Sequence, residues 1–439
     1  MLICYAVATQ DTAEDEELFA IPRSSILTTE TVDLPKEIRE IIDDPWLALI
    51  LAMVYDYNLG VASPWRPYWD VLPTEFDTLM FWSEQELSEL EGSAVVNKLG
   101  KETADENFKE KLIPTMRQHS ALFNLDDVTD EQLLIQCHRM GSLIMAYAFD
   151  LEKPSDNDAH NQQEEWEEDS DAGDMLPKGM VPLADMLNAD ADRNNAKLFY
   201  EDDKVVMKSI KPIKAGEEIF NDYGPLPRAD VLRRYGYVTD NYAKYDVVEI
   251  PFELISVTAG QMTKLVKVRD AGWEERMNYL EEQGVLEDGY DISKTESEGG
   301  PFTEELCVLL NTITTEKAEF DKLKKKDKLP KPQLSKPSME LLLQILSTRR
   351  AMYPTRQDSE AMEADDTDSQ RSQRRRQMAL QVIAGEKEVL HEAINHVQGL
   401  LGEPSSKKRT AEQLEDSAAN VQKMRKRYDE STESKENGT

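Results

Sequence analysis

The chain has 439 residues, more than a single compact core usually contains, so we expect two or three structural units. Its 86 acidic residues against 51 basic ones give a formal net charge of -35. This excess of acid excludes general binding to nucleic acid through phosphate contacts, and it favours encounters with a basic protein partner.

Cysteine usage and hydropathy exclude further classes. Cys4, Cys137 and Cys307 lie far apart and form no CxxC pair, so neither a disulfide framework nor a cysteine zinc site is expected. A reducing, intracellular compartment fits best. The apolar start MLICYAVA is typical of a buried strand, because it is too short for a signal peptide or a membrane span. No membrane partner is expected.

Short strands are predicted over the first 36 residues, from the runs CYAVAT and LFAIP on either side of a polar turn. Helical patterns follow. Asp44 and Pro45 mark a helix start, because proline is tolerated in the first turn of a helix.

Two pairs of residues have the spacing of a capping box, in which the side chains at the helix start and at its third residue each bind the other's backbone. They are Ser83 with Glu86, and Thr129 with Gln132. The second pair begins a largely apolar helix that we expect to run from Glu131 to Phe149.

The stretch 154–174 holds nine acids and no Lys or Arg, which predicts a disordered insertion. After it, AKLFYEDDKVVMKS alternates like two paired strands joined by a polar turn. Beyond Tyr245 the pattern is mostly helical to about Leu401, with breaks at 322–337 and 357–369. Residues 402–439 predict a disordered, charged tail.

Candidate ligand-binding side chains cluster between Met180 and Glu249. Asp185 and Asn188 lie three apart after a buried apolar run. Further on, Tyr223 follows a predicted strand in the run NDYG, and the run LRRYGYV comes next. An Asn amide can both donate and accept, which suits a ligand with an amine and a carboxylate, while a buried Tyr offers one hydroxyl that can be aimed.

The runs VPLADMLNAD, GEEIFNDYG and LRRYGYV, in this order, resemble the SET-domain lysine methyltransferases, and within them the subgroup typified by the plant Rubisco large-subunit methyltransferase. SPWRPYWDVLP is similar to the helical insertion of that subgroup, and ATQDTAEDEELFAIPR looks like its first strands. LNAD, NAKLFY and KYDVVE look most like the fungal ribosomal lysine methyltransferases. Asn-x-Tyr-Gly alone would be a weak signal, but the ordered series is specific.

The resemblance implies an α+β fold, in which a β-rich SET domain is split by a helical insertion and is followed by an all-helical C-terminal substrate-binding domain. The implied boundaries are 1–36 for the N-terminal strands, 37–128 for the helical insertion, 129–239 for the SET core with its acidic insertion 154–174, 240–401 for the substrate-binding domain, and 402–439 for the tail.

The implied reaction is N-methylation of a protein lysine by S-adenosylmethionine, without a metal. A lysine amine has a reference pKa of about 10.4 and must lose its proton before it attacks the methyl group. Burial in a narrow apolar channel lowers that pKa. Positioning and desolvation then supply most of the acceleration of the in-line displacement.

By resemblance, Tyr223 is the catalytic tyrosine, whose hydroxyl lines the site of the transferring methyl together with backbone carbonyls. Asn188 should hold the methionine portion of the cofactor, with Tyr235 packing nearby and Asp185 bracing the site. Each of these residues also has a plain structural interpretation as a core tyrosine, a turn residue or a helix cap. Tyr237 is the alternative to Tyr235 as the ligand contact.

The chain departs from the family pattern in two places. Ala189 stands where a histidine usually follows the asparagine, a change that the fungal ribosomal subgroup shares. The family also has a glycine-rich Gly-x-Gly-Arg loop just before the first strand, whereas this sequence begins MLICYAVATQ. The missing loop favours one alternative function, a catalytically silent SET protein that acts as a binding module.

The implied partner is a basic protein of the large ribosomal subunit, with a histone or another nuclear protein as the alternative substrate. Basic clusters at 407–409 and 423–427 resemble a bipartite nuclear import signal, although charge-mixed tails contain such clusters by chance. We therefore expect a nuclear protein that can also be cytoplasmic. We expect it to act as a monomer.

Overall fold

The structure is a computed structural model that describes residues 6–152, 176–262, 271–297, 300–354 and 367–402. The predicted acidic insertion and nearly all of the predicted tail lie outside these residues. The chain forms two compact units. The first consists of residues 1–82, 99–226 and 230–237, and the second of residues 83–98, 227–229 and 238–439.

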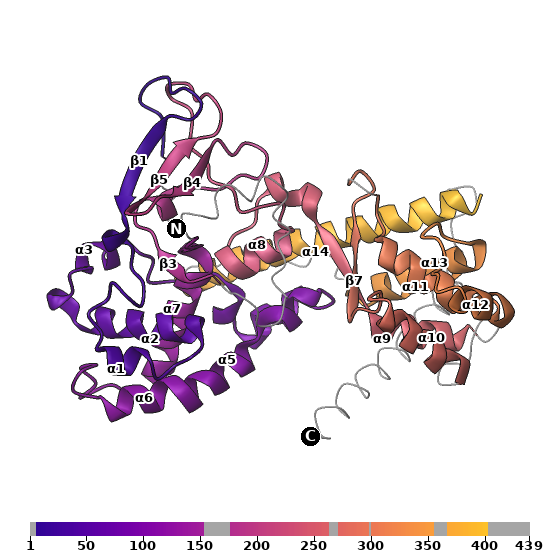
Figure 1. Ribbon diagram of the computed structural model, residues 1–439, viewed down its shortest axis with the longest axis horizontal. Coiled ribbons are helices and arrows are strands. Elements are labelled where there is room, and N and C mark those ends of the chain that lie inside the picture. The colour runs from indigo at the N-terminus through magenta and orange to yellow at the C-terminus, as the bar shows by residue number, and fades with distance from the viewer. Residues whose placement is uncertain (1–5, 153–175, 263–270, 298–299, 355–366, 403–439) are drawn as a thin grey trace. The chain divides into compact units, whose positions relative to one another are not determined.

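The larger sheet of the first unit is antiparallel and has three strands (Figure 1). Its order is β1 (Glu17–Pro22), β5 (Lys204–Ser209), β4 (Ala196–Tyr200). β4 and β5 are the strand pair that the alternation predicts, and β1 joins them with an irregularity between Glu17 and Phe19. One face of the sheet packs on a small apolar core that includes Val181, Ala184 and Leu187.

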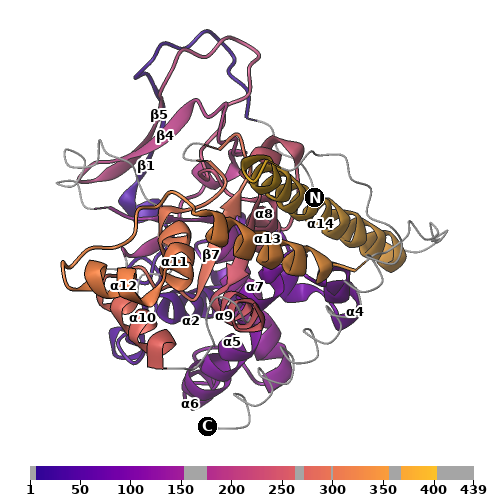
Figure 2. The ribbon, with the colours of Figure 1, turned by 90° about the vertical axis from the view of Figure 1, so that its right-hand side faces the viewer.

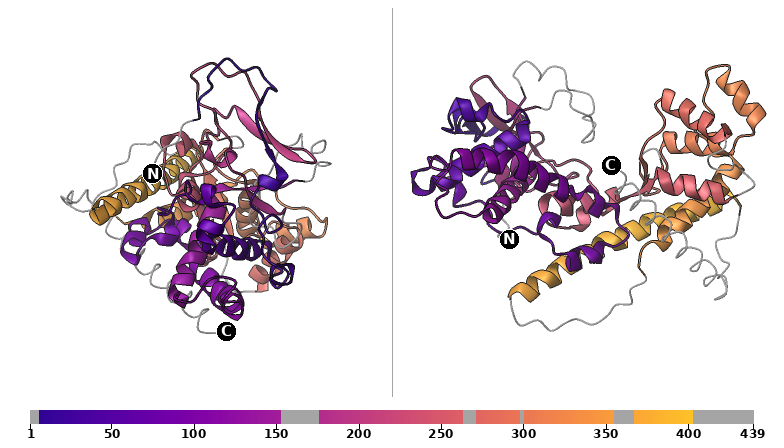
Figure 3. Two further views of the ribbon diagram at one scale, coloured as in Figure 1. Left: turned by 90° about the vertical axis from the view of Figure 1, so that its left-hand side faces the viewer. Right: turned by 90° about the horizontal axis from the view of Figure 1, so that it is seen from below.

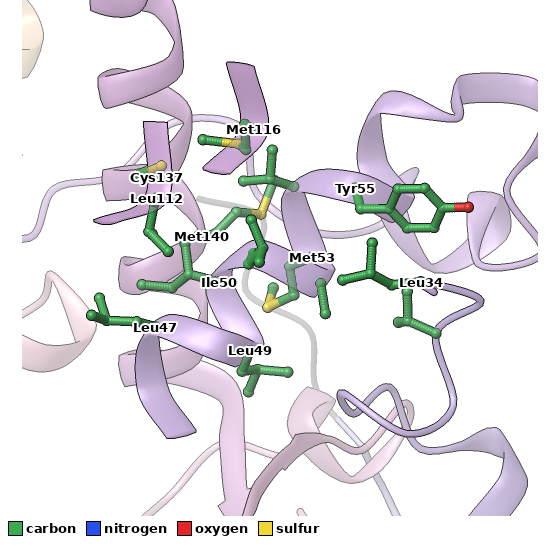
Figure 4. Close-up of a cluster of buried hydrophobic side chains, with 14 of the residues drawn as sticks. Leu34, Leu47, Leu49, Ile50, Met53, Tyr55, Leu112, Met116, Cys137 and Met140 are labelled. Carbon is green, nitrogen blue, oxygen red and sulfur yellow. The ribbon is translucent and has the colours of Figure 1, made fainter. Parts of the chain in front are cut away.

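A second, larger core of the first unit lies among helices. α2 (Pro45–Asn58) begins where predicted, with the Asp44 carboxylate accepting from the Leu47 backbone N–H at 2.9 Å. Most of its residues are buried, because α2 is apolar on nearly all sides. Figure 4 shows its side chains beside Leu112, Met116 of α6 (Ile113–Gln118), and Cys137 and Met140 of α7 (Asp130–Tyr147). The same core also takes side chains from α1 (Lys36–Arg39), α3 (Arg66–Trp69) and α5 (Lys101–Asn107).

The chain leads from this helical core to the candidate site through a short two-stranded sheet. α7 begins with the predicted capping box of Thr129 and Gln132, and it ends at Tyr147, two residues before the expected Phe149. β2 (Ala148–Asp150) continues directly from α7 and pairs with β3 (Lys178–Met180).

The second unit is largely helical. A two-stranded sheet of β6 (Val247–Pro251) and β7 (Gly289–Ser293) adds to the predicted helices. α14 (Thr367–Leu400) is one long helix, visible along its length in Figure 3. Figure 2 labels further helices of this unit. They are α4 (Glu84–Leu87), α9 (Phe252–Gln261), α10 (Ala271–Glu282), α11 (Glu304–Thr314), α12 (Lys317–Lys324) and α13 (Lys336–Ala351). Within the described residues, no helix combines the length and apolarity needed to cross a bilayer.

Gly236 ends α8 (Arg228–Tyr235) and is sterically constrained. Its φ is +73°, and a Cβ there would lie 2.8 Å from the Thr78 backbone nitrogen. We expect Gly236→Ala to lower the free energy of unfolding by about 2–4 kcal/mol, the sum of left-handed strain and overpacking. Gly216→Ala is the control, since Gly216 has φ +88° but no neighbour within 4 Å. Urea denaturation followed by circular dichroism should show the larger loss in Gly236→Ala; equal losses would contradict the close approach.

Candidate functional site

The first part of the candidate site is a strained turn after β3. Leu183 has φ +77° and ψ -43°, a left-handed conformation that is rare for a residue with a Cβ. A single 3-10 turn, Ala184–Met186, follows. Asp185 is buried in this turn, whereas Leu183 and Met186 on either side of it are exposed. Backbone strain of this kind is retained mainly where the surrounding structure or the function requires it.

Asp185 contacts a tyrosine from the helical insertion. The Tyr68 hydroxyl of α3 donates a hydrogen bond to Asp185 Oδ2. Burial raises the pKa of Asp185 to about 6, and the Tyr68 hydrogen bond opposes this shift. The other carboxylate oxygen, Oδ1, is buried and has no hydrogen-bond partner among the residues that the structure describes.

Asn188 lies where two distant segments meet. Its carbonyl accepts from the Asn221 backbone N–H at 2.8 Å, and the Asn221 carbonyl accepts from Asp190 N–H at 3.1 Å. These bonds hold the runs LNAD and NDYG in parallel contact. The Asn188 amide Nδ2 donates to Glu218 Oε1 at 2.6 Å. The amide nitrogen is thereby fixed in place beside a carboxylate.

Tyr223 and Tyr235 stack face to face, with ring centroids 4.2 Å apart and an interplanar angle of 4°. The Asp222 carboxylate accepts from the Gly224 N–H at 2.7 Å, and Gly224 has φ +77°, so a tight turn presents Tyr223. Burial raises the pKa of Tyr235 to about 12, which keeps its hydroxyl protonated at neutral pH.

A third tyrosine extends this aromatic group. The Tyr237 ring lies 6.4 Å from the Tyr235 ring, and burial also raises the pKa of Tyr237. Tyr147, at the end of α7, interacts electrostatically with both Tyr237 and Tyr68. Aromatic side chains from the helical insertion and from the motif segments therefore belong to one region of the first unit.

The structure brings the four residues singled out in the sequence into this region. Tyr223 stacks on Tyr235, and Asn188 bonds to the segment that carries Tyr223. Asp185 occupies the turn just before Asn188. Their catalytic and cofactor-binding roles stay predictions.

Two further residues of the site carry no local signal in the sequence. Tyr68 lies 117 residues from Asp185, and Glu218 lies 30 residues from Asn188. Tyr68 belongs to the segment SPWRPYWDVLP, which was recognised as an insertion, but nothing local in that segment marks its hydroxyl as a partner for a distant carboxylate.

Family models match both units. The SET domain model matches residues 4–224, half of the chain, and a model described as Rubisco LSMT substrate-binding matches residues 268–390. The chain belongs to the SET-domain family. The predicted relationship to the Rubisco large-subunit methyltransferase subgroup is confirmed.

Relatives of this SET protein are named lysine methyltransferases. It is 36% identical over 258 residues to "Ribosomal lysine N-methyltransferase 4" of Saccharomyces cerevisiae, covering 57% of this chain and 52% of that protein. It is 28% identical over 420 residues to "N-lysine methyltransferase SETD6" of Homo sapiens, covering 88% and 83%. The match thus spans about half of the yeast protein and most of the human one. The predicted enzyme class, protein-lysine N-methyltransferase, is confirmed for the family.

Solved structures agree with the predicted fold. The chain superimposes on the SET domain of LSMT bound to MeLysine and AdoHcy with a TM-score of 0.61 at 20% identity, covering 90% of this chain and 84% of that one. Rubisco LSMT bound to AdoMet gives a TM-score of 0.61 at 20% identity, covering 90% and 85%. The SET fold with a largely helical C-terminal domain is confirmed.

Proposed function

We propose that this protein transfers a methyl group from S-adenosylmethionine to a lysine of a basic protein of the large ribosomal subunit. One observation carries the proposal. Two segments distant in the sequence meet at Asn188 and Asn221, beside the tyrosine that stacks on Tyr235. This arrangement sits inside a chain whose SET domain match covers residues 4–224.

The side chains of the site suit the chemical groups of the cofactor. Its methionine portion has an ammonium, for which the Glu218 carboxylate and the Asn188 amide offer oxygen acceptors. Its sulfonium is a cation, which aromatic faces such as those of Tyr223 and Tyr235 favour. When bound, the cofactor supplies an electrophilic methyl group.

The residues of the chain then have three tasks. The tight turn of Asp222 and Gly224 presents the Tyr223 hydroxyl. Tyr235 supports the Tyr223 ring from one face, so that the ring cannot tilt without breaking the stack. The half-buried Tyr223 and Tyr235 offer aromatic surface against which an incoming lysine amine would lose water. Such desolvation lowers the pKa of the amine, which must be neutral to attack.

The substrate part of the proposal rests on charge and on similarity. A net charge of -35 attracts a basic protein, and ribosomal proteins are basic. The 36% identity to the yeast ribosomal enzyme exceeds the 28% identity to human SETD6, although the human match is longer. The alternative substrate is a histone or another nuclear protein. The basic clusters at 407–409 and 423–427 support the proposed nuclear location.

A competition assay tests the substrate. The protein is incubated with radiolabelled S-adenosylmethionine and a mixture of equal amounts of large-subunit ribosomal proteins and histones. The labelled lysine is then located by mass spectrometry. We expect label in a large-subunit ribosomal protein. Label in histones alone would contradict the proposed substrate. No label in any protein, together with no heat of cofactor binding in titration calorimetry, would favour the silent binding module.

A further inference from the structure

Tyr68 connects the helical insertion to the motif segment of the site. It lies on α3, and its hydroxyl donates to Asp185 Oδ2. Both residues are only 9% exposed. The bond therefore joins two buried side chains that are 117 residues apart in the sequence.

The bonding of Asp185 is incomplete. A buried polar atom without a partner is destabilising, and such atoms are uncommon in folded proteins. Asp185 Oδ1 is one of them within the described residues, although Oδ2 of the same carboxylate is satisfied by Tyr68. The turn that carries it is also strained at Leu183. Asp56 of α2 shares this pattern in the described residues, with Oδ1 bonded to Ser63 and Trp69 and Oδ2 without a partner, but it lies in the helical core and not beside the motif segments.

The position of Asp185 indicates which kind of group Oδ1 can accept a hydrogen bond from. It lies one turn before Asn188, whose own amide is fixed by Glu218. A carboxylate oxygen in such a site suits an ammonium or amine, because a buried charge is tolerated when it is paired and hydrogen-bonded. Two nitrogen groups can donate to it in lysine methylation: the amine of the target lysine, which must be neutral to attack, and the ammonium of the methionine portion of the cofactor.

Building on the proposed function, we propose that Tyr68 is a positioning residue for the methylation reaction. It holds Oδ2 of Asp185, so that Oδ1 stays in place as the acceptor for an N–H of the neutral lysine amine or of the cofactor ammonium.

The pair also predicts a pH dependence. Burial raises the pKa of Asp185, while the Tyr68 hydroxyl lowers it, as do the backbone N–H groups of Asp185 and Leu183, which come near the carboxylate without meeting hydrogen-bond geometry at Oδ1. The charge of Tyr147 on α7 acts in turn on the pKa of Tyr68. Without the Tyr68 hydroxyl, the pKa of Asp185 must rise. The ionised acceptor is then present only at higher pH, and the acidic limb of the pH–rate profile moves upward.

The test compares Tyr68→Phe, Asp185→Asn and their combination with wild type. Tyr68→Phe should lower kcat/KM at neutral pH about tenfold, the effect of losing one hydrogen bond to a charged group. The acidic limb should shift to higher pH, and the double variant should be no worse than Asp185→Asn. A higher KM for the protein substrate identifies the lysine as the ligand, and a higher Kd for S-adenosylmethionine identifies the cofactor.

Tyr200→Phe is the matched control. The Tyr200 hydroxyl of β4 donates to the Asp150 carbonyl at 2.5 Å and is buried in the same unit. Its loss should lower the melting temperature without moving the acidic limb. The positioning role fails if Tyr68→Phe behaves like Tyr200→Phe while wild type is active. A wild type that methylates nothing overturns the proposed function, and this proposal with it.

Thermal melting provides a readout that needs no activity. The pKa of Asp185 is raised in the folded state, so its contribution to stability is full at low pH and is lost as pH rises through about 6. Tyr68→Phe should enlarge the loss of melting temperature between pH 5 and pH 8, since the ionised carboxylate loses its donor. Asp185→Asn should remove the pH-dependent contribution of residue 185 to the melting temperature, because an amide does not titrate. If Tyr68→Phe loses no more melting temperature between pH 5 and pH 8 than wild type does, the proposed effect of Tyr68 on Asp185 is wrong.

Discussion

Tyr223→Phe should lower kcat by about 10²–10³-fold, the usual effect of removing one preorganised polar group from a reaction centre. The affinity for S-adenosylmethionine should change little. The substitution keeps the aromatic ring, so the parallel stack on Tyr235 at 4.2 Å survives. The turn set by Asp222 and Gly224 is also untouched, because its hydrogen bond involves no atom of Tyr223. Only the hydroxyl is lost.

Single-turnover kinetics and titration calorimetry separate the two effects. A fall in the rate of the chemical step with an unchanged Kd assigns the Tyr223 hydroxyl to methyl transfer. Tyr200→Phe, which removes a buried hydroxyl elsewhere in the first unit, should retain full turnover. If Tyr223→Phe turns over as fast as wild type, Tyr223 is only a packing residue and its assignment as the catalytic tyrosine is wrong.

Local signals in the sequence predicted the local structure. The capping boxes at Ser83 and Thr129 are both present, because each needs only two side chains three residues apart. The alternating run that became β4 and β5 likewise contains both strands and the turn between them. Short-range periodicity and spacing are sufficient for such elements.

Long-range partners could not be predicted in this way. Glu86 completes its predicted capping box, and it also pairs with Arg375 of α14 at 2.9 Å, 289 residues away. The Tyr68 bond to Asp185 is of the same kind. Because a single sequence holds no trace of which distant polar groups meet, it gave the candidate residues of the site but only part of their surroundings.

The predicted first strand shows a related limit. The apolar run CYAVAT predicts a strand, and its described residues do pair with a distant segment: Val7 bridges to Glu218, and Ala6 and Ala8 form backbone hydrogen bonds with residues 216–219. Residues 1–5 lie outside the described part. The second predicted run, LFAIP, forms β1 after the polar turn, but its partner β5 is distant in the sequence. Apolar composition alone does not specify where a strand finds its partner.

Gly385→Ala should destabilise the second unit by about 3–5 kcal/mol, because it would disrupt a buried ion pair. Gly385 of α14 faces Arg228 and Asp246, which are 7% and 3% exposed. The Arg228 guanidinium donates to Asp246 Oδ2 through Nη2 at 2.6 Å and through Nε at 2.9 Å. A Cβ at Gly385 would lie 2.1 Å from that same carboxylate oxygen.

Both atoms that the added Cβ meets are side-chain ends, but they are buried and hydrogen-bonded to each other. The added methyl group would also lie 2.2 Å from Arg228 Nη2, so it meets both partners of the pair at once. Either the helix moves away from the pair, or the two charges separate and one loses its partner in a buried site. Burial already raises the pKa of Asp246, and Arg228 opposes that shift, so separation would leave a carboxylate without its counter-ion.

Gly399→Ala provides the matched control in the same helix. Gly399 has no neighbour within 4 Å of an added Cβ, so alanine there should stabilise α14 by about 0.5–1 kcal/mol through helix propensity. Differential scanning calorimetry should therefore show a lower melting temperature in Gly385→Ala and an equal or higher one in Gly399→Ala. If both variants gain stability, Gly385 is not needed for close packing, and the Arg228–Asp246 pair does not set how near α14 can approach.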